Sequence, residues 1–202
     1  MAKTAGIVII GNEVLSGKTH DTNSYFLCTE LRRLGVEVQR ISTVQDVIEI
    51  IGAEVAAFSK RFDFVFTTGG VGPTHDDVTI EGIAHGFGVN VVRHSDIERR
   101  MRQRLGADVN EARLRMANVP EGSKLLATEA LFAPVVNIHN VYIFPDSPGT
   151  LSRDQRNVPR HALFSQERLS QIRRGGDRGD AQRCPGEVSR SHVGFLPRVG
   201  YP

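Results

Sequence analysis

Apolar residues in the first 145 positions alternate between two periods, one typical of buried strands and one typical of amphipathic helices. Short apolar or alternating runs predict strands at 6–10, 36–42, 62–66 and 89–92, with one strand or a tight pair over 135–144. Longer runs with apolar residues three and four apart predict helices at 22–34, 46–59, 78–87, 95–105 and 109–117. Strands that alternate with helices are typical of right-handed βαβ crossovers. The pattern predicts an α/β domain whose mostly parallel sheet is covered on both faces.

Residues at the expected helix ends fit this division. Gly35 and Gly88 follow the last apolar position of their helices, where glycine commonly ends a helix. Ser95 is the expected N-cap of the fourth helix, and Glu98 would complete a capping box. Asp46 stands at the start of the second helix, so its position alone favours an N-cap over a functional carboxylate.

The pattern stops after Pro145, and the remaining residues are rich in Arg, Gly, Ser and Pro. Such a segment cannot bury enough apolar surface to offset its ordering entropy. We therefore expect a domain at 1–148 and a mostly disordered, Arg-rich tail at 149–202, with a weak helix over 160–172. From Leu151 onward there are ten Arg, no Lys and five acidic residues, whereas the preceding positions hold 15 basic and 18 acidic residues. The net charge of +2 thus combines a mildly acidic domain with a basic tail.

Composition excludes several classes of protein. The basic tail lacks interleaved aromatic residues and any binding motif, which disfavours nucleic acid as a partner. No apolar run reaches about 18 residues, so we expect no membrane-spanning helix. Two cysteines do not make a disulfide framework, and an apolar strand begins almost at the first residue, which leaves no room for a signal peptide. We expect a cytoplasmic protein.

The most distinctive chemistry follows the strand over 62–66, where residues 67–79 read Thr-Thr-Gly-Gly-Val-Gly-Pro-Thr-His-Asp-Asp-Val-Thr. Three glycines let the backbone turn sharply and bring its N–H groups close to an anion. Asp76 and Asp77 stand where the next helix begins. Acids there also complement the helix dipole, but the glycine loop favours a functional role for at least one of them. A glycine loop before a helix predicts a phosphate site, and the adjacent carboxylates indicate a divalent metal.

A second glycine loop follows the first strand at Gly11. Residues 11–19 are similar to a Walker A loop, but five residues instead of four separate Gly11 from Gly17, so we do not expect a P-loop. Ligands of parallel sheets bind at the carboxyl ends of the strands. We therefore expect the loops at Gly11 and Gly69 to share one cleft.

Other reactive side chains offer weaker candidates. His20 and His75 are expected to be polar loop residues, with a phosphate or metal contact as the open alternative. Ser16 and Ser24 have no recognisable paired base, so no nucleophile is predicted. Cys28 stands among apolar helical positions, where a packed thiol is expected rather than a reactive one.

Two motifs of the chain belong together. The first is Gly11-Asn-Glu-Val-Leu-Ser-Gly17 with Asp21-Thr-Asn-Ser24, and the second is the loop at 69–79. Together they resemble the MoaB/Mog family of molybdopterin-binding-like domains. The stretches at 118–122 and 134–145 are similar to its CinA-type branch and, more closely, to the amino-terminal domain of eukaryotic FAD synthases. The resemblance covers about residues 4–145. It implies a three-layer α/β/α domain that assembles as a homo-oligomer, a trimer or a dimer.

The resemblance also implies roles for particular residues. Asp77 and Asp46 would be catalytic, which makes Asp46 both cap and catalyst. Asp76, Asp77 and Glu13 would hold a divalent cation, Mg²⁺ or Co²⁺, with K⁺ as a second ion. The nucleotide would bind at Gly11, Gly69, Gly70, Gly72 and Thr74.

The implied activity is a metal-dependent pyrophosphatase, a hydrolase acting on FAD or ADP-ribose. The alternative is a non-catalytic nucleotide- or molybdopterin-binding regulatory module, and a molybdopterin adenylyltransferase is disfavoured by the CinA-type motifs. Asn12 departs from the branch, which carries Asp there, and a neutral amide would weaken metal affinity. The expected Pro-Gly-x-Pro turn reads Pro145-Asp-Ser-Pro148, where the similarity ends. The resemblance therefore implies a chain truncated relative to FAD synthase, without the FMN adenylyltransferase domain.

Overall fold

The computed structural model describes residues 2–126 and 134–144. The expected disordered tail at 149–202, its weak helix over 160–172 and the turn at 145–148 all lie outside the described residues. Of the described helices, none is both long enough and apolar enough to cross a membrane.

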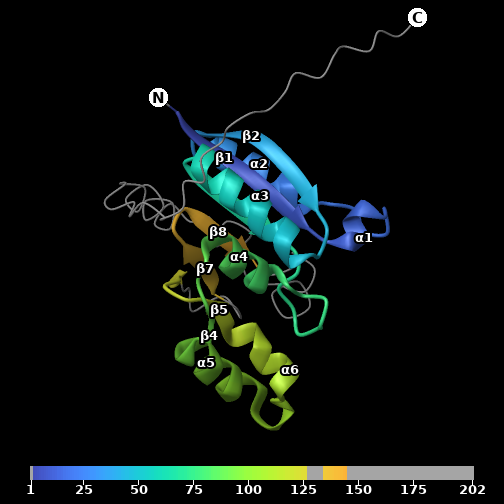
Figure 1. Ribbon diagram of the computed structural model, residues 1–202, viewed down its shortest axis with the longest axis vertical. Coiled ribbons are helices and arrows are strands. Elements are labelled where there is room, and N and C mark those ends of the chain that lie inside the picture. The colour runs from blue at the N-terminus through green and yellow to red at the C-terminus, as the bar shows by residue number, and fades with distance from the viewer. Residues whose placement is uncertain (1, 127–133, 145–202) are drawn as a thin grey trace, which may run out of the picture.

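A six-stranded mixed sheet forms the centre of the molecule, in the order β2-β1-β3-β8-β7-β6 (Figure 1). Strands β2, β1, β3 and β8 run parallel to one another, whereas β7 pairs antiparallel with both β8 and β6. This confirms the mostly parallel sheet and shows that 135–144 is a tight antiparallel pair. The strands span Lys3–Ile10 (β1), Val36–Val44 (β2), Phe64–Thr68 (β3), Lys124–Leu126 (β6), Val135–Ile138 (β7) and Val141–Phe144 (β8).

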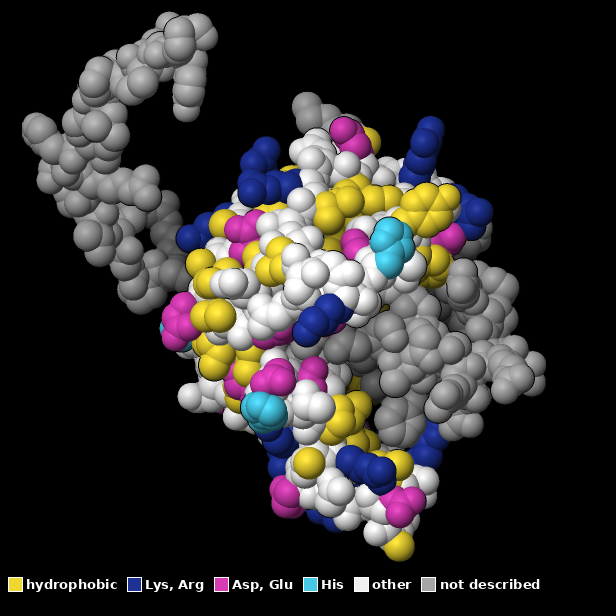
Figure 2. Space-filling view, turned by 90° about the vertical axis from the view of Figure 1, so that its right-hand side faces the viewer, with side chains coloured by type: hydrophobic (Ala, Val, Ile, Leu, Met, Phe, Trp, Pro, Cys, Tyr) yellow, Lys and Arg dark blue, Asp and Glu magenta, His cyan; other side chains and the backbone are white. Residues whose placement is uncertain are grey.

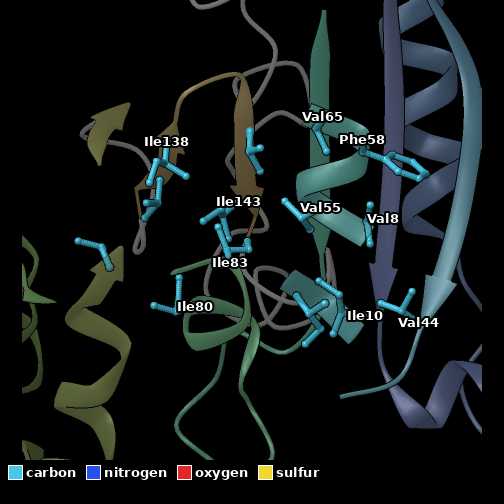
Figure 3. Close-up of a cluster of buried hydrophobic side chains, with 14 of the residues drawn as sticks. Val8, Ile10, Val44, Val55, Phe58, Val65, Ile80, Ile83, Ile138 and Ile143 are labelled. Atoms are coloured by element: carbon cyan, nitrogen blue, oxygen red, sulfur yellow. The ribbon is translucent and has the colours of Figure 1, made fainter. Parts of the chain in front are cut away.

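Helices cover both faces of the sheet and complete three layers. Helix α2 (Asn23–Arg33) packs Leu27 and Leu31 on one face, in a cluster with Phe64 and Phe66. Helices α3 (Ile48–Arg61) and α4 (Thr79–Phe87) cover the other face, where side chains of both helices meet those of β1, β3 and β8 (Figure 3). Strands β1 and β3 are buried on both faces, and their successive side chains point alternately into the two cores.

A smaller lobe lies at one end of the sheet, at the bottom of Figure 1. Strands β4 (Val91–Arg93) and β5 (Asn118–Pro120) form a separate antiparallel pair. Between them lie α5 (Ser95–Leu105), the 3₁₀ turn η1 (Gly106–Asp108), α6 (Glu111–Leu114) and the 3₁₀ turn η2 (Arg115–Ala117). Buried residues of the lobe, including Ile97 and Met101, belong to the same core cluster as α3 and α4. The lobe is therefore packed onto the main body.

The structure corrects two predicted helix starts and adds one helix. Helix α3 begins at Ile48 with Val47 as its N-cap, and Asp46 makes no cap because its carboxylate accepts a hydrogen bond from another loop. The N-cap of α5 is His94, whose Nδ1 accepts from the Asp96 amide, so Ser95 is the first helical residue. A short helix, α1 (Asn12–Leu15), was not predicted. Gly35 and Gly88 end their helices as expected, both with positive φ.

Candidate functional site

The loop between β3 and α4 packs directly against the end of β1. Gly69 and Gly70 have φ values of +104° and +63°, conformations that residues with a Cβ rarely adopt. A Cβ on Gly69 would lie 1.8 Å from the carbonyl oxygen of Ile10, so any residue other than glycine would clash with this backbone. The predicted need for glycine at this strand end is confirmed.

Thr79, the first residue of α4, fixes the orientation of the loop peptides. Its buried hydroxyl donates a 2.7 Å hydrogen bond to the Gly69 carbonyl, and its amide donates a 3.1 Å bond to the Gly70 carbonyl. In a trans peptide the N–H points opposite to the C=O, so the next amides face away from Thr79.

The next three backbone amides of the loop are candidates for binding a ligand. Within the described residues, the backbone N–H groups of Gly70, Val71 and Gly72 have no hydrogen-bond partner. We call these three residues the glycine loop. Successive unpaired amides near a helix N-terminus can hold an anion such as phosphate.

Asp77 lies beside the glycine loop and is held there by Thr74. Its Oδ2 accepts hydrogen bonds from the Thr74 amide, at 2.8 Å, and from the Thr74 hydroxyl. The same oxygen would lie 2.5 Å from a Cβ on Gly72, so the carboxylate sits against the loop backbone. Thr74 uses both donors to position Asp77, and its contact with a nucleotide stays a prediction.

Asp46 brings the two glycine-bearing loops together. Its Oδ2 accepts a 2.7 Å hydrogen bond from the Asn12 amide, next to Gly11, while its Oδ1 lies 3.4 Å from where a Cβ on Gly70 would stand. The two loops therefore lie next to each other at the carboxyl ends of β1, β2 and β3, and a cleft shared by both stays a prediction. Asn12 takes part through its backbone, a contact that does not depend on its side chain.

The predicted metal ligands are not gathered into one cluster. The Glu13 carboxylate lies against the Gly11 backbone, and Asp76 pairs with His75 at 2.8 Å, with both side chains more than 70% exposed. Among residues 2–126 and 134–144, no group of three or more His, Cys, Asp or Glu side chains could hold a metal ion. A ready-made three-carboxylate site from Glu13, Asp76 and Asp77 is thus not what the structure shows.

A pocket opens between the glycine loop and the small lobe, and its far wall was missed by sequence reasoning. Glu81 of α4, Arg115 of η2 and Asn118 of β5 line it together with Asp77 and the glycine loop. The Arg115 Nη2 lies 3.6 Å from the Glu81 Oε1. The sequence placed Asn118 in a stretch similar to the family but predicted no role for Glu81 or Arg115. No local pattern shows which side chains a separate lobe will bring to the site.

Figure 2 views the molecule from the side of α1 and the glycine loop. Acidic and basic side chains are intermixed over the described part of this face. The described residues of this face therefore do not present the single-sign basic field typical of a nucleic-acid surface.

The other sequence candidates have structural roles. The Asp21 carboxylate accepts from the amides of Asn23 and Ser24 at the start of α2, and the Asn23 side chain donates to the Thr68 hydroxyl at 2.7 Å. Cys28, a residue of α2, packs against the core, and burial, followed by the charge of Asp21, raises the pKa of its thiol. The packed position predicted for Cys28 is confirmed, and its low reactivity stays a prediction.

Comparison with protein families gives one match over most of the chain. The family model described as a probable molybdopterin binding domain matches residues 6–153. A Caenorhabditis elegans protein named probable FAD synthase is 39% identical over 168 residues, which cover 72% of this chain and 32% of the relative. A CinA-like protein of Fusobacterium nucleatum is 33% identical over 149 residues, 73% of this chain and 37% of the relative. The chain thus spans about a third of the length of these curated relatives.

Solved structures share the fold. The CinA protein of Thermoplasma acidophilum, described as having unknown function, superimposes with a TM-score of 0.67 at 30% identity, covering 76% of this chain and 98% of that one. The molybdopterin biosynthesis enzyme MoaB of Thermus thermophilus has a TM-score of 0.50 at 17% identity, over 84% of this chain and 96% of that one, which concerns the fold alone. The three-layer α/β architecture is confirmed.

Proposed function

The chain belongs to the family of probable molybdopterin binding domains, and on that premise we propose that it binds a nucleotide diphosphate such as FAD or ADP-ribose and hydrolyses the diphosphate bond. One observation carries the proposal: the three unpaired amides of the glycine loop lie between two fixed carboxylates, Asp77 and Asp46. Free amides recognise phosphate, and carboxylates beside phosphate recognise a cation.

Binding would use the backbone of the glycine loop. Phosphate oxygens accept hydrogen bonds from N–H groups, and such bonds to a charged partner are shorter and stronger than neutral ones. The carbonyls of Gly69 and Gly70 are already bonded to Thr79, so the amides of Gly70 and Val71 need not reorganise when the anion arrives. This pre-set geometry favours binding because little conformational freedom remains to be lost.

The residues present fit a cation that is held jointly with the ligand. Mg²⁺ is commonly bound by one or two carboxylates together with substrate phosphates, and Asp77 and Asp46 both lie beside the glycine loop. Such a cation, Mg²⁺ or Co²⁺, would neutralise phosphate charge and lower the pKa of a bound water. We extend the proposal to K⁺ as an accessory ion. Hydrolysis adds water to one phosphorus and breaks its bond to the bridging oxygen, so FAD yields FMN and AMP, with protons released to solvent.

The test is incubation of the purified chain with FAD and Mg²⁺ or Co²⁺, with and without K⁺, followed by chromatography of the products. FMN and AMP should appear in equal amounts, and Asp77→Asn and Asp46→Asn should each abolish their release. The matched control is Asp96→Asn, an acid on α5 whose partner is Arg99. Absence of turnover with every metal would contradict the enzymatic proposal.

A second candidate is a non-catalytic nucleotide- or molybdopterin-binding regulatory module. It is favoured by the use of both carboxylates in backbone hydrogen bonds and by the neutral Asn12 beside Asp46. It predicts that FAD raises the melting temperature without any product. Asn12→Asp separates the two candidates, because a gain of turnover in that variant would show that only the missing charge limits catalysis.

We also propose that the domain acts as a homo-oligomer, a trimer or a dimer, in the cytoplasm. The family resemblance supports the oligomer. The low cysteine content, two in 202 residues, supports the cytoplasm. Sedimentation velocity measures the oligomer, and a single monomeric species at micromolar concentration would contradict it. Fractionation of cells that express the tagged chain tests the location, and recovery of the chain with the membrane pellet would contradict the cytoplasm.

A further inference from the structure

The pocket wall opposite the glycine loop carries a cation that the proposed function has not used. Arg115, in the 3₁₀ turn of the small lobe, lines the same pocket as Gly70, Gly72 and Asp77. Its side chain is 39% exposed, so it is half-buried but open to a ligand in the pocket. The inference below rests on the proposed binding of a phosphorylated ligand.

The guanidinium of Arg115 has donors to spare. Its only described partner is Glu81 on α4, at 3.6 Å, which is longer than a hydrogen bond. Other arginines of the lobe are better matched: Arg102 donates to Glu98 at 2.6 Å and Arg93 donates to Glu111 at 3.2 Å. Within the described residues the Arg115 side chain donates no hydrogen bond, so its planar fork of five N–H donors is open.

The side chains that line the pocket indicate what the guanidinium of Arg115 could bind. Among the described residues that line the pocket, Asp77 and Glu81 are acidic and Arg115 is the one basic residue. A guanidinium fork matches phosphate oxygens in a bidentate arrangement, and it does so better than a lysine ammonium. The glycine loop presents its free amides to the same space.

We propose that Arg115 binds a phosphate group of the nucleotide, completing from the small lobe a site that the glycine loop begins. Glu81 holds the guanidinium in the pocket while no ligand is bound and competes with the phosphate for it. Phosphate binding therefore replaces the long Arg115–Glu81 ion pair with direct hydrogen bonds from the guanidinium to the phosphate. Arg115 is a ligand-binding residue and Glu81 a positioning residue.

This assignment predicts opposite effects for the two partners of one ion pair. Arg115→Met removes donors and should weaken binding of a phosphorylated ligand. Glu81→Gln removes the competitor and a repelling charge, so it should strengthen that binding. A purely structural tie between lobe and body predicts instead that both variants act in the same direction.

The experiment measures dissociation constants by calorimetry for inorganic pyrophosphate and ADP in the presence of Mg²⁺, with adenosine as the phosphate-free probe. For ADP, Arg115→Met should bind about tenfold or more weakly, Arg115→Lys should be intermediate, and Glu81→Gln should bind several-fold more tightly. Affinity for adenosine should not change in any variant. Arg99→Met, which removes an α5 arginine paired with Asp96, is the matched control and should bind ADP like the wild type.

Two results would overturn the inference while the proposed function stands: Arg115→Met binding ADP as tightly as the wild type, or Glu81→Gln weakening ADP binding as Arg115→Met does. If the wild type binds neither ADP nor pyrophosphate, the proposed function fails first and the inference with it. Should Arg115→Met not fold, the Arg115→Lys and Glu81→Gln comparison still decides the sign.

Discussion

Replacing Gly69 by alanine should remove much of the stability of this domain, and far more than the same change at Gly88. Both glycines have positive φ, +104° and +67°. A left-handed alanine costs about 1–2 kcal/mol on conformation alone. At Gly88 nothing lies within 4 Å of the new methyl, so that is the whole expected loss.

At Gly69 a steric term is added. The new Cβ would stand 1.8 Å from the Ile10 carbonyl oxygen, about 1.5 Å closer than an ordinary carbon–oxygen contact. The obstacle is backbone, and Ile9 of the same strand is held in register with Thr68, so neither side moves without breaking the sheet. We expect a total loss of about 3–5 kcal/mol, the range of a severe backbone and packing defect.

Urea unfolding followed by far-ultraviolet circular dichroism measures both variants, since the chain has no tryptophan for fluorescence. For an m-value of about 2 kcal/mol/M, the midpoint of Gly69→Ala should fall by at least about 1 M more than that of Gly88→Ala. Stabilisation by ADP should also disappear in Gly69→Ala and persist in Gly88→Ala. Equal midpoints for the two variants would refute the claim that the glycine loop is fixed by its contact with β1.

Three further changes test other parts of the structure. Thr79→Val removes the buried hydroxyl donor to Gly69 and should cost about 1–3 kcal/mol in urea unfolding, whereas an unchanged midpoint would show the bond is unimportant. The Thr4 amide, which hydrogen-bonds the Asp63 carboxylate, holds the pKa of Asp63 below its usual value. The stability this provides is full above about pH 4 and is lost as pH falls through the lowered pKa, so Asp63→Asn and wild type should converge in acid, and a gap that persists there would contradict it. Because burial raises the pKa of the Cys28 thiol, mass spectrometry should find it alkylated more slowly in folded than in urea-unfolded protein; equal rates would contradict a packed thiol.

Most of the fold could be predicted from the sequence because the long elements carry unambiguous periods. The apolar run that ends at Ile10 predicted a strand and the helical spacing before Gly88 predicted a helix, and the structure confirms both. Helix starts were less predictable, since Asp46 has the chemistry of an N-cap but binds the Asn12 amide instead. Its true partner lies 34 positions away, beyond any local pattern.

The candidate site was predictable only on one side. The glycines at 69 and 70 stand out in the sequence because a strand end that turns sharply requires them. Arg115 and Glu81 stand out in no pattern, since surface arginines and glutamates on helices are common. They meet because β5 pairs with β4 and so returns the chain beside α4, a long-range contact that periodicity does not encode.

The most direct test of the glycine loop as a phosphate site is a titration of the ¹⁵N-labelled chain with ADP and Mg²⁺, observed through the backbone amide resonances. Hydrogen bonding to phosphate changes the environment of an N–H directly, so Gly70, Val71 and Gly72 should shift most and saturate together. Adenosine should leave the same resonances in place. Saturable ADP binding whose largest shifts lie elsewhere, with these three amides unmoved, would contradict the account.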